Sequence, residues 1–150
     1  MNARKSVVFA IAALAIGGIA ACSEEDEGPQ PEVFVATLNG QQEVPAVTTA
    51  ATGTGRVEFT TTGLTFTVSV ANIANVTAAH IHASPTAVVG VNGGVVLNII
   101  SAASTVTNGV LGAGSATATN PGNAISMDSL KVLIRGGRAY FNVHNTANPG

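Results

Sequence analysis

Sixty-nine consecutive residues, from Phe59 to Met127, contain no aspartate, glutamate, lysine or arginine. Within this segment, every second residue from Leu64 to Val70 is apolar, and the residues between them are threonine or serine. A period of two is typical of an antiparallel strand with one buried face. The longest apolar run of the chain, residues 7–21, has 15 residues, fewer than the roughly 20 that a membrane-spanning helix needs. The uncharged segment therefore predicts β-sheet rather than a membrane span.

The same alternation predicts further short strands, separated by turns rich in glycine, asparagine and proline. These strands are Val33–Leu38, Arg56–Thr60, Val76–Ala83, Gly94–Ile100, Val110–Thr119 and Ala139–His144. One segment differs, because residues 126–136 place apolar side chains at the spacing of a helix, with Ser126 able to cap its start and Gly136 its end. We therefore expect an all-β fold, an antiparallel β-sandwich with Greek-key-like connections and one short helix near residues 126–136.

Residues 1–21 have the features of an export signal. Arg4 and Lys5 precede the apolar run, which matches the charged and apolar regions of a secretory leader. The run ends in Ile-Ala-Ala-Cys at residues 19–22, which resembles a bacterial lipobox, and Cys22 is the only cysteine. We expect lipidation of Cys22, a lipid anchor in a membrane and, since Ser23 follows, the bacterial outer membrane as destination. The alternative is a small-residue cleavage site followed by an incidental cysteine.

Residues 22–32 form a candidate tether between the leader and the domain. They contain five acidic residues and two prolines, a composition that favours a solvated spacer. An acidic cluster after a lipidated cysteine also resembles the export signal of surface-exposed lipoproteins, so surface-exposed and periplasm-facing placements both remain open. The domain itself, residues 33–150, has four basic and three acidic side chains. This near-neutral balance argues against nucleic acid as a partner.

The three histidines form the one candidate constellation. His80 and His82 flank Ile81 in a predicted strand, so their rings project from one face about 6.6 Å apart at Cα. His144 shares a strand face with Tyr140 and Asn142. If the two strands are neighbours, the three imidazoles meet in one patch, which suits Cu²⁺ or Zn²⁺ and leaves a coordination position open. The alternative is that the histidines hold loops by hydrogen bonds to the backbone.

Motifs of catalysis do not accompany the histidines. The sequence has no Gly-x-Ser-x-Gly, no paired carboxylates and no glycine-rich loop that leads into a helix. We therefore expect no enzymatic activity. Glu43 lies in an irregular segment before Pro45, where a partly buried ion pair with Arg135 or Arg138 is expected.

Four segments in this order resemble the CHRD domain, a module that is repeated in chordin and also found singly in bacterial exported proteins. They are residues 38–45 (LNGQQEVP), 79–82 (AHIH), 90–96 (GVNGGVV) and 137–144 (GRAYFNVH). The resemblance implies a β-sandwich and an extracellular binding role, with Glu43, Pro45 and Asn142 as residues of the structural motif. The His-x-His strand is also similar to the copper strand of Cu/Zn superoxide dismutases.

The chain departs from the CHRD pattern in three places. Ala46 stands where a second proline is common, and Asn145 where threonine usually follows the histidine. The family pattern also continues beyond the Asn-Pro-Gly of residues 148–150 with a closing strand, so the final strand is apparently missing. We expect this to leave an unpaired sheet edge.

Together these observations favour a membrane-anchored, non-enzymatic extracytoplasmic module for binding or adhesion, with an extracellular protein or glycan as its ligand. The alternative is a histidine-based copper or zinc protein with a weak similarity to superoxide dismutase.

Overall fold

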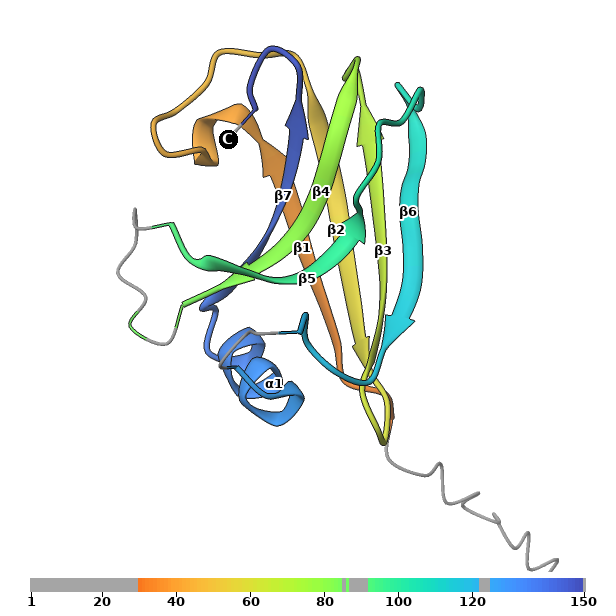
Figure 1. The fold of residues 1–150 in the computed structure, drawn as a ribbon, viewed down its shortest axis with the longest axis vertical. Helices are drawn as coiled ribbons and strands as arrows, with labels where there is room; N and C mark the ends of the chain where they lie inside the picture. The colour runs from red at the N-terminus through yellow and green to blue at the C-terminus, as the bar shows by residue number, and fades with distance from the viewer. Residues whose placement is uncertain (1–29, 85, 87–91, 122–124, 150) are drawn as a thin grey trace, which may run out of the picture.

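The computed structural model describes residues 30–84, 86, 92–121 and 125–149, and these form a sandwich of two antiparallel sheets (Figure 1). One sheet has the order β1-β2-β3-β6, and its strands are β1 (Val33–Asn39), β2 (Thr52–Phe59), β3 (Leu64–Ala71) and β6 (Gly109–Ala116). The other has the order β5-β4-β7, and its strands are β5 (Gly94–Ile100), β4 (Val76–Ala83) and β7 (Ala139–Asn145). The prediction of an all-β sandwich with one short helix is confirmed.

The helix is α1 (Met127–Arg135), and both of its predicted ends are confirmed. The Ser126 hydroxyl accepts a hydrogen bond from the backbone N–H of Ser129, and Gly136 follows the last turn. Leu130 and Leu133 are buried against the sheets. A single-turn 3₁₀ helix, η1 (Gly40–Gln42), follows β1.

Strand β2 begins at Thr52, four residues before its predicted start. Its first half contains Gly53 and Gly55, which have no side chains and therefore do not show the alternation of apolar and polar residues. Gly55 faces the other sheet, and the ring of Phe141 occupies the space that a side chain at residue 55 would need. The sequence pattern could not show this, because the contact joins two strands that are far apart in the chain.

The core lies between the two sheets in two clusters. One lies beside α1 and includes Phe59, Leu64 and Ile81. The other lies toward the opposite end and includes Val68 and Val76. In the register of β4 with β7, His80 pairs with Asn142 and His82 with Tyr140. This register places the two histidine-bearing strands side by side.

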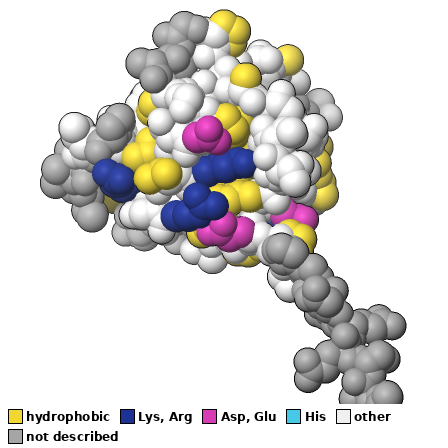
Figure 2. All heavy atoms as spheres, turned by 90° about the horizontal axis from the view of Figure 1, so that it is seen from below, with side chains coloured by type: hydrophobic (Ala, Val, Ile, Leu, Met, Phe, Trp, Pro, Cys, Tyr) yellow, Lys and Arg dark blue, Asp and Glu magenta, His cyan; other side chains and the backbone are white. Residues whose placement is uncertain are grey.

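Charged side chains of both signs lie together on the face at the α1 end of the sandwich (Figure 2). Arg135 donates three hydrogen bonds of 2.7–3.1 Å to the Glu32 carboxylate, and its guanidinium lies 4.9 Å from the ring centre of Phe59. The backbone N–H of Phe59 in turn donates to the Glu32 carbonyl. The chain is therefore held to the domain at Glu32. Among the described residues, no helix is long and apolar enough to cross a membrane.

Candidate functional site

The three histidines lie together on the outer face of the β5-β4-β7 sheet. The ring of His80 lies 5.7 Å from that of His82 and 5.0 Å from that of His144, measured between ring centres. Each ring offers one nitrogen such that all three nitrogens lie within 4.8 Å of one another. We call His80, His82 and His144 the histidine cluster.

Alternation along β4 explains why the rings face outward. Ala79, Ile81 and Ala83 point into the core and are at most 2% exposed. The intervening residues 80 and 82 therefore face away from the core. On β7, Phe141 and Val143 pack against the core clusters, so that His144 faces the same side as its two partners.

His82 is fixed in one tautomer by its surroundings. Its Nδ1 lies 2.9 Å from the carbonyl oxygen of Gly93, and because a carbonyl can only accept, Nδ1 carries the proton. In the neutral ring, Nε2 therefore presents a lone pair. This Nε2 is shielded from solvent and has no hydrogen-bond partner among the described residues. A buried, unpaired acceptor costs free energy, so the lone pair of Nε2 is open to a hydrogen-bond donor or a metal ion.

Tyr140 completes the support of His82. The two rings stack with 5.0 Å between their centres and 14° between their planes. The hydroxyl oxygen of Tyr140 accepts a hydrogen bond of 3.0 Å from the backbone N–H of Gly93. Gly93 is thus held by Tyr140 through its N–H and holds His82 through its carbonyl. Histidines that bind metals are usually oriented by such carbonyl groups.

The other two histidines contact each other directly. His80 Nδ1 lies 3.1 Å from His144 Nε2, so the two nitrogens share one proton. Zinc–nitrogen bonds of 2.0–2.1 Å in a tetrahedral site separate two ligand nitrogens by about 3.3 Å. The pair is therefore spaced so that both nitrogens could bind one ion in place of the shared proton. The limit of 4.8 Å within the cluster is wider than this spacing, so the third nitrogen would have to move inward to bind the same ion.

Burial and the neighbouring histidines favour the neutral forms of His80 and His144. Burial lowers the pKa of His80, and the charges of His144 and His82 lower it further. Burial also lowers the pKa of His144, as does His82, while the Glu43 carboxylate and the backbone of Pro149 act in the opposite direction. Neutral imidazole is the form that binds metal ions.

The sequence does not indicate that Gly93 and Tyr140 support His82. The alternation that places Tyr140 on the face of His144 was visible, but nothing in it showed a contact with Gly93. Gly93 follows a turn signal at Asn92, and a Cβ at residue 93 would lie only 2.6 Å from the carbonyl oxygen of Ala83. This close backbone approach explains why residue 93 is a glycine, and it is visible only in the fold.

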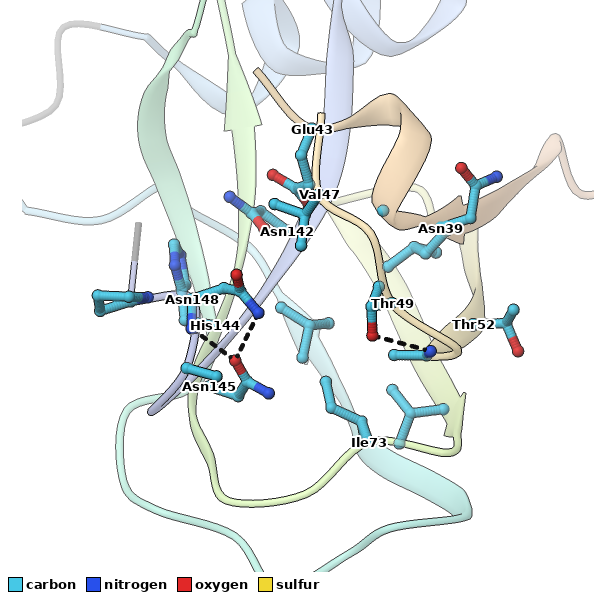
Figure 3. Close-up of a pocket in the computed structure, with 18 of the residues that line it drawn as sticks. Asn39, Glu43, Val47, Thr49, Thr52, Ile73, Asn142, His144, Asn145 and Asn148 are labelled. Carbon is cyan, nitrogen blue, oxygen red and sulfur yellow. Dashed lines mark hydrogen bonds between the residues drawn. The ribbon is translucent and has the colours of Figure 1, made fainter. Parts of the chain in front are cut away.

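Of the residues predicted for the structural motif, Asn142 lies in β7, and Glu43 and Pro45 lie beside this strand. Glu43, Pro45 and Asn142 line one cavity together with His144 (Figure 3). The expected ion pair of Glu43 with Arg135 or Arg138 is wrong. Arg135 pairs with Glu32 at the α1 end, and Glu43 is exposed and forms no ion pair with any described residue. Cys22, the leader of residues 1–21 and most of the tether lie outside the described residues.

Comparison with known proteins gives one result. Neither a curated protein nor a solved structure matches the chain. A model of the CHRD domain family matches residues 34–150. This range covers both sheets, α1 and the histidine cluster. Since the match spans well over half of the sequence, the chain belongs to the CHRD domain family.

Proposed function

We propose that this CHRD domain is a metal-binding module in which His80, His82 and His144 hold one copper(II) or zinc(II) ion. The observation that carries the proposal is the buried Nε2 of His82, which has a lone pair and no partner among the described residues. Three imidazoles suit both ions. Copper(II) is expected to bind more tightly, since affinities for nitrogen sites peak at copper among the divalent metals.

Charge around the cluster supports a divalent ion. Neutral imidazole ligands bring no charge of their own. The pKa of His144 is lowered by burial, and the Glu43 carboxylate is close enough to oppose this shift. The same negative charge would stabilise a cation held by the three rings. Three protein ligands leave a coordination position open for water or a further ligand.

Metal titration of protein purified without a histidine tag tests the proposal. We expect one equivalent of copper(II) per chain, with nitrogen hyperfine splitting in the electron paramagnetic resonance spectrum. His82→Gln should weaken binding about 100-fold or more, because it removes the preoriented ligand. Thr54→Ala, an exposed position on the other sheet, is the matched control and should bind as the parent does. Absence of stoichiometric copper or zinc uptake would refute the proposal.

Melting temperatures with chelator and with copper separate a metal site from purely structural histidines. If the rings serve only to hold loops, the triple variant with glutamine at positions 80, 82 and 144 is less stable than the parent in chelator. Adding metal then leaves the stability of the parent unchanged. If they form a metal site, copper raises the melting temperature of the parent and leaves that of the triple variant unchanged.

We also propose that the module is non-enzymatic and acts outside the cytoplasm, held to the bacterial outer membrane by lipid on Cys22. The support is the leader and lipobox-like sequence of residues 1–22 and the lack of a nucleophile motif. An extracellular protein or glycan is a further ligand class for such a module. Labelling with a radioactive fatty acid is the test: label should enter the parent and be absent from Cys22→Ser, and equal labelling of both would exclude this anchor.

A further inference from the structure

A cavity of about 280 Å³ lies beside β7, in addition to the histidine cluster (Figure 3). One wall is the irregular segment after η1, between Glu43 and Thr49, and the opposite wall is the turn from Asn145 to Pro149. Its volume is close to the lower limit, about 300 Å³, of pockets that bind small organic molecules. It is about twice the size of an engineered cavity that takes up benzene.

The wall after η1 is held by hydrogen bonds within the chain. The backbone N–H groups of Val47 and Glu43 both donate to the carbonyl of Gly40, at 2.8 and 3.3 Å. Gly40 is buried, and a side chain there would collide with the carbonyl of Val47 and lie 2.7 Å from Thr49 Cγ2. The side chain of Asn39 caps η1 by accepting from Gln41. This wall therefore keeps its shape without a ligand.

The opposite wall is held just as independently. The backbones of Asn145 and Asn148 exchange two hydrogen bonds of 3.1 Å, and the Asn145 side chain accepts a further one of 2.8 Å from the Asn148 N–H. The N–H of Thr146 donates to the carbonyl of Asn75, which joins the turn to the start of β4. A cavity with two preformed walls spends little binding free energy on ordering the protein.

Most side chains that line the cavity are apolar. They include Leu38, Val47, Val70, Ile73 and Val143. Val70 and Ile73 belong to the core cluster at this end of the sandwich, so the base of the cavity is fixed by packing. Such a surface favours an aliphatic or aromatic body, because burying it removes apolar area from water.

Two polar side chains in the lining are available to a ligand. Neither the Glu43 carboxylate nor the Asn142 amide has a hydrogen-bond partner among the described residues, although both line the cavity (Figure 3). Among the described residues that line the cavity, Glu43 is the one acidic residue, and none is lysine or arginine. A ligand with a positive charge therefore meets a complementary charge, while a carboxylate ligand would be repelled.

We propose that this cavity binds a small organic amine, with its ammonium group on Glu43 and its apolar body against Val47, Ile73 and Val143. Asn142 supplies a second hydrogen bond at the polar side. The proposal does not depend on metal binding, although His144 belongs to both the cavity lining and the histidine cluster.

Titration of the chelator-treated chain with 2-phenylethylamine, followed by two-dimensional ¹H–¹⁵N NMR, tests the proposal. We expect saturable shifts of the amides of Val47, Val143 and Asn148. 3-Phenylpropionate, similar in size but opposite in charge, should bind at least about tenfold more weakly, because the Glu43 carboxylate attracts an ammonium group and repels a carboxylate. Equal binding of the two probes, or shifts that do not saturate, would overturn the proposal.

Three variants locate the site. Glu43→Gln keeps the shape and removes the charge, and should weaken amine binding about tenfold. Ala147→Phe fills the cavity from its exposed rim without altering the core, and should abolish binding. His82→Gln removes a metal ligand outside the lining and should leave amine binding unchanged. If His82→Gln lost amine binding, the amine would bind at the histidine cluster. If Glu43→Gln and Ala147→Phe both kept full binding, the amine would bind elsewhere. Either result would refute the cavity as its site.

Discussion

The two faces of the β5-β4-β7 sheet are built from the same strands and have opposite properties. On the inner face, Ala79, Ile81 and Ala83 of β4 are almost fully buried. On the outer face, the residues between them are histidines, and one ring nitrogen is buried with no partner among the described residues. The inner face packs into the core, and the outer face carries polar rings that the core packing does not require. Residues of the core and residues of the proposed metal site thus alternate along the same strand.

The largest effect is expected from the inner face. Ile81→Ala leaves a cavity at a residue that is 2% exposed and should lower the free energy of unfolding by about 3 kcal/mol. Chemical denaturation followed by circular dichroism measures this. Val35→Ala is the control, because Val35 lies on β1 in the other sheet and is 71% exposed, and it should change the free energy by less than about 0.5 kcal/mol. Similar losses in both variants would contradict the assignment of Ile81 to the core.

An intermediate effect is expected from Tyr140, which supports the outer face. Tyr140→Phe retains the ring stacked on His82 and loses the hydroxyl that holds the Gly93 N–H. Metal affinity should fall about 10- to 100-fold, as for other groups that orient metal ligands. Competition titration with a chelator gives the affinity, and ¹⁵N shifts of the His82 ring report the tautomer. Unchanged affinity with an unchanged tautomer would show that the hydroxyl does not position His82.

The smallest effect is expected from pH. Burial lowers the pKa of His80 and His144 below their ordinary value of 6.5, so near and below that pH the unfolded chain binds more protons than the folded chain. Stability from these two histidines is therefore complete well above pH 6.5 and declines as the pH falls toward their folded-state pKa values. In chelator, the melting temperature should fall between about pH 7.5 and about pH 5. The double variant His80→Gln/His144→Gln should show a smaller fall, and an identical fall would argue against this origin.

Much of the fold could be predicted because its signals are local. The alternation from Leu64 to Val70 and the caps Ser126 and Gly136 are each contained in a few neighbouring residues. The start of β2 was missed because Gly53 and Gly55 carry no alternation, and the reason for Gly55 is Phe141 in the other sheet. Contacts between sheets decide such positions, and a single sequence does not display them.

The candidate site could likewise be predicted only where its signals are local. The spacing of His80 and His82 and the face of His144 were readable from period two, and the pairing of β4 with β7 brings them together. The support of His82 by Gly93 and Tyr140 joins residues 47 positions apart, so no local pattern contains it. The expected partner of Glu43 was wrong for a similar reason, since the fold places Arg135 beside Glu32.

The attachment at Glu32 has a mechanical consequence. Strand β1 begins at the next residue and pairs with β2 at seven positions, from Val33 with Glu58 to Asn39 with Thr52. Antiparallel hydrogen bonds run perpendicular to the strands, so a pull along β1 from the preceding chain loads these pairs in shear, all at once. The ion pair of Glu32 with Arg135 and the bond from Phe59 to the Glu32 carbonyl meet that load first. A domain held by its tether at this end would resist tension through all the pairs of β1 with β2 together. These pairs would not open one at a time.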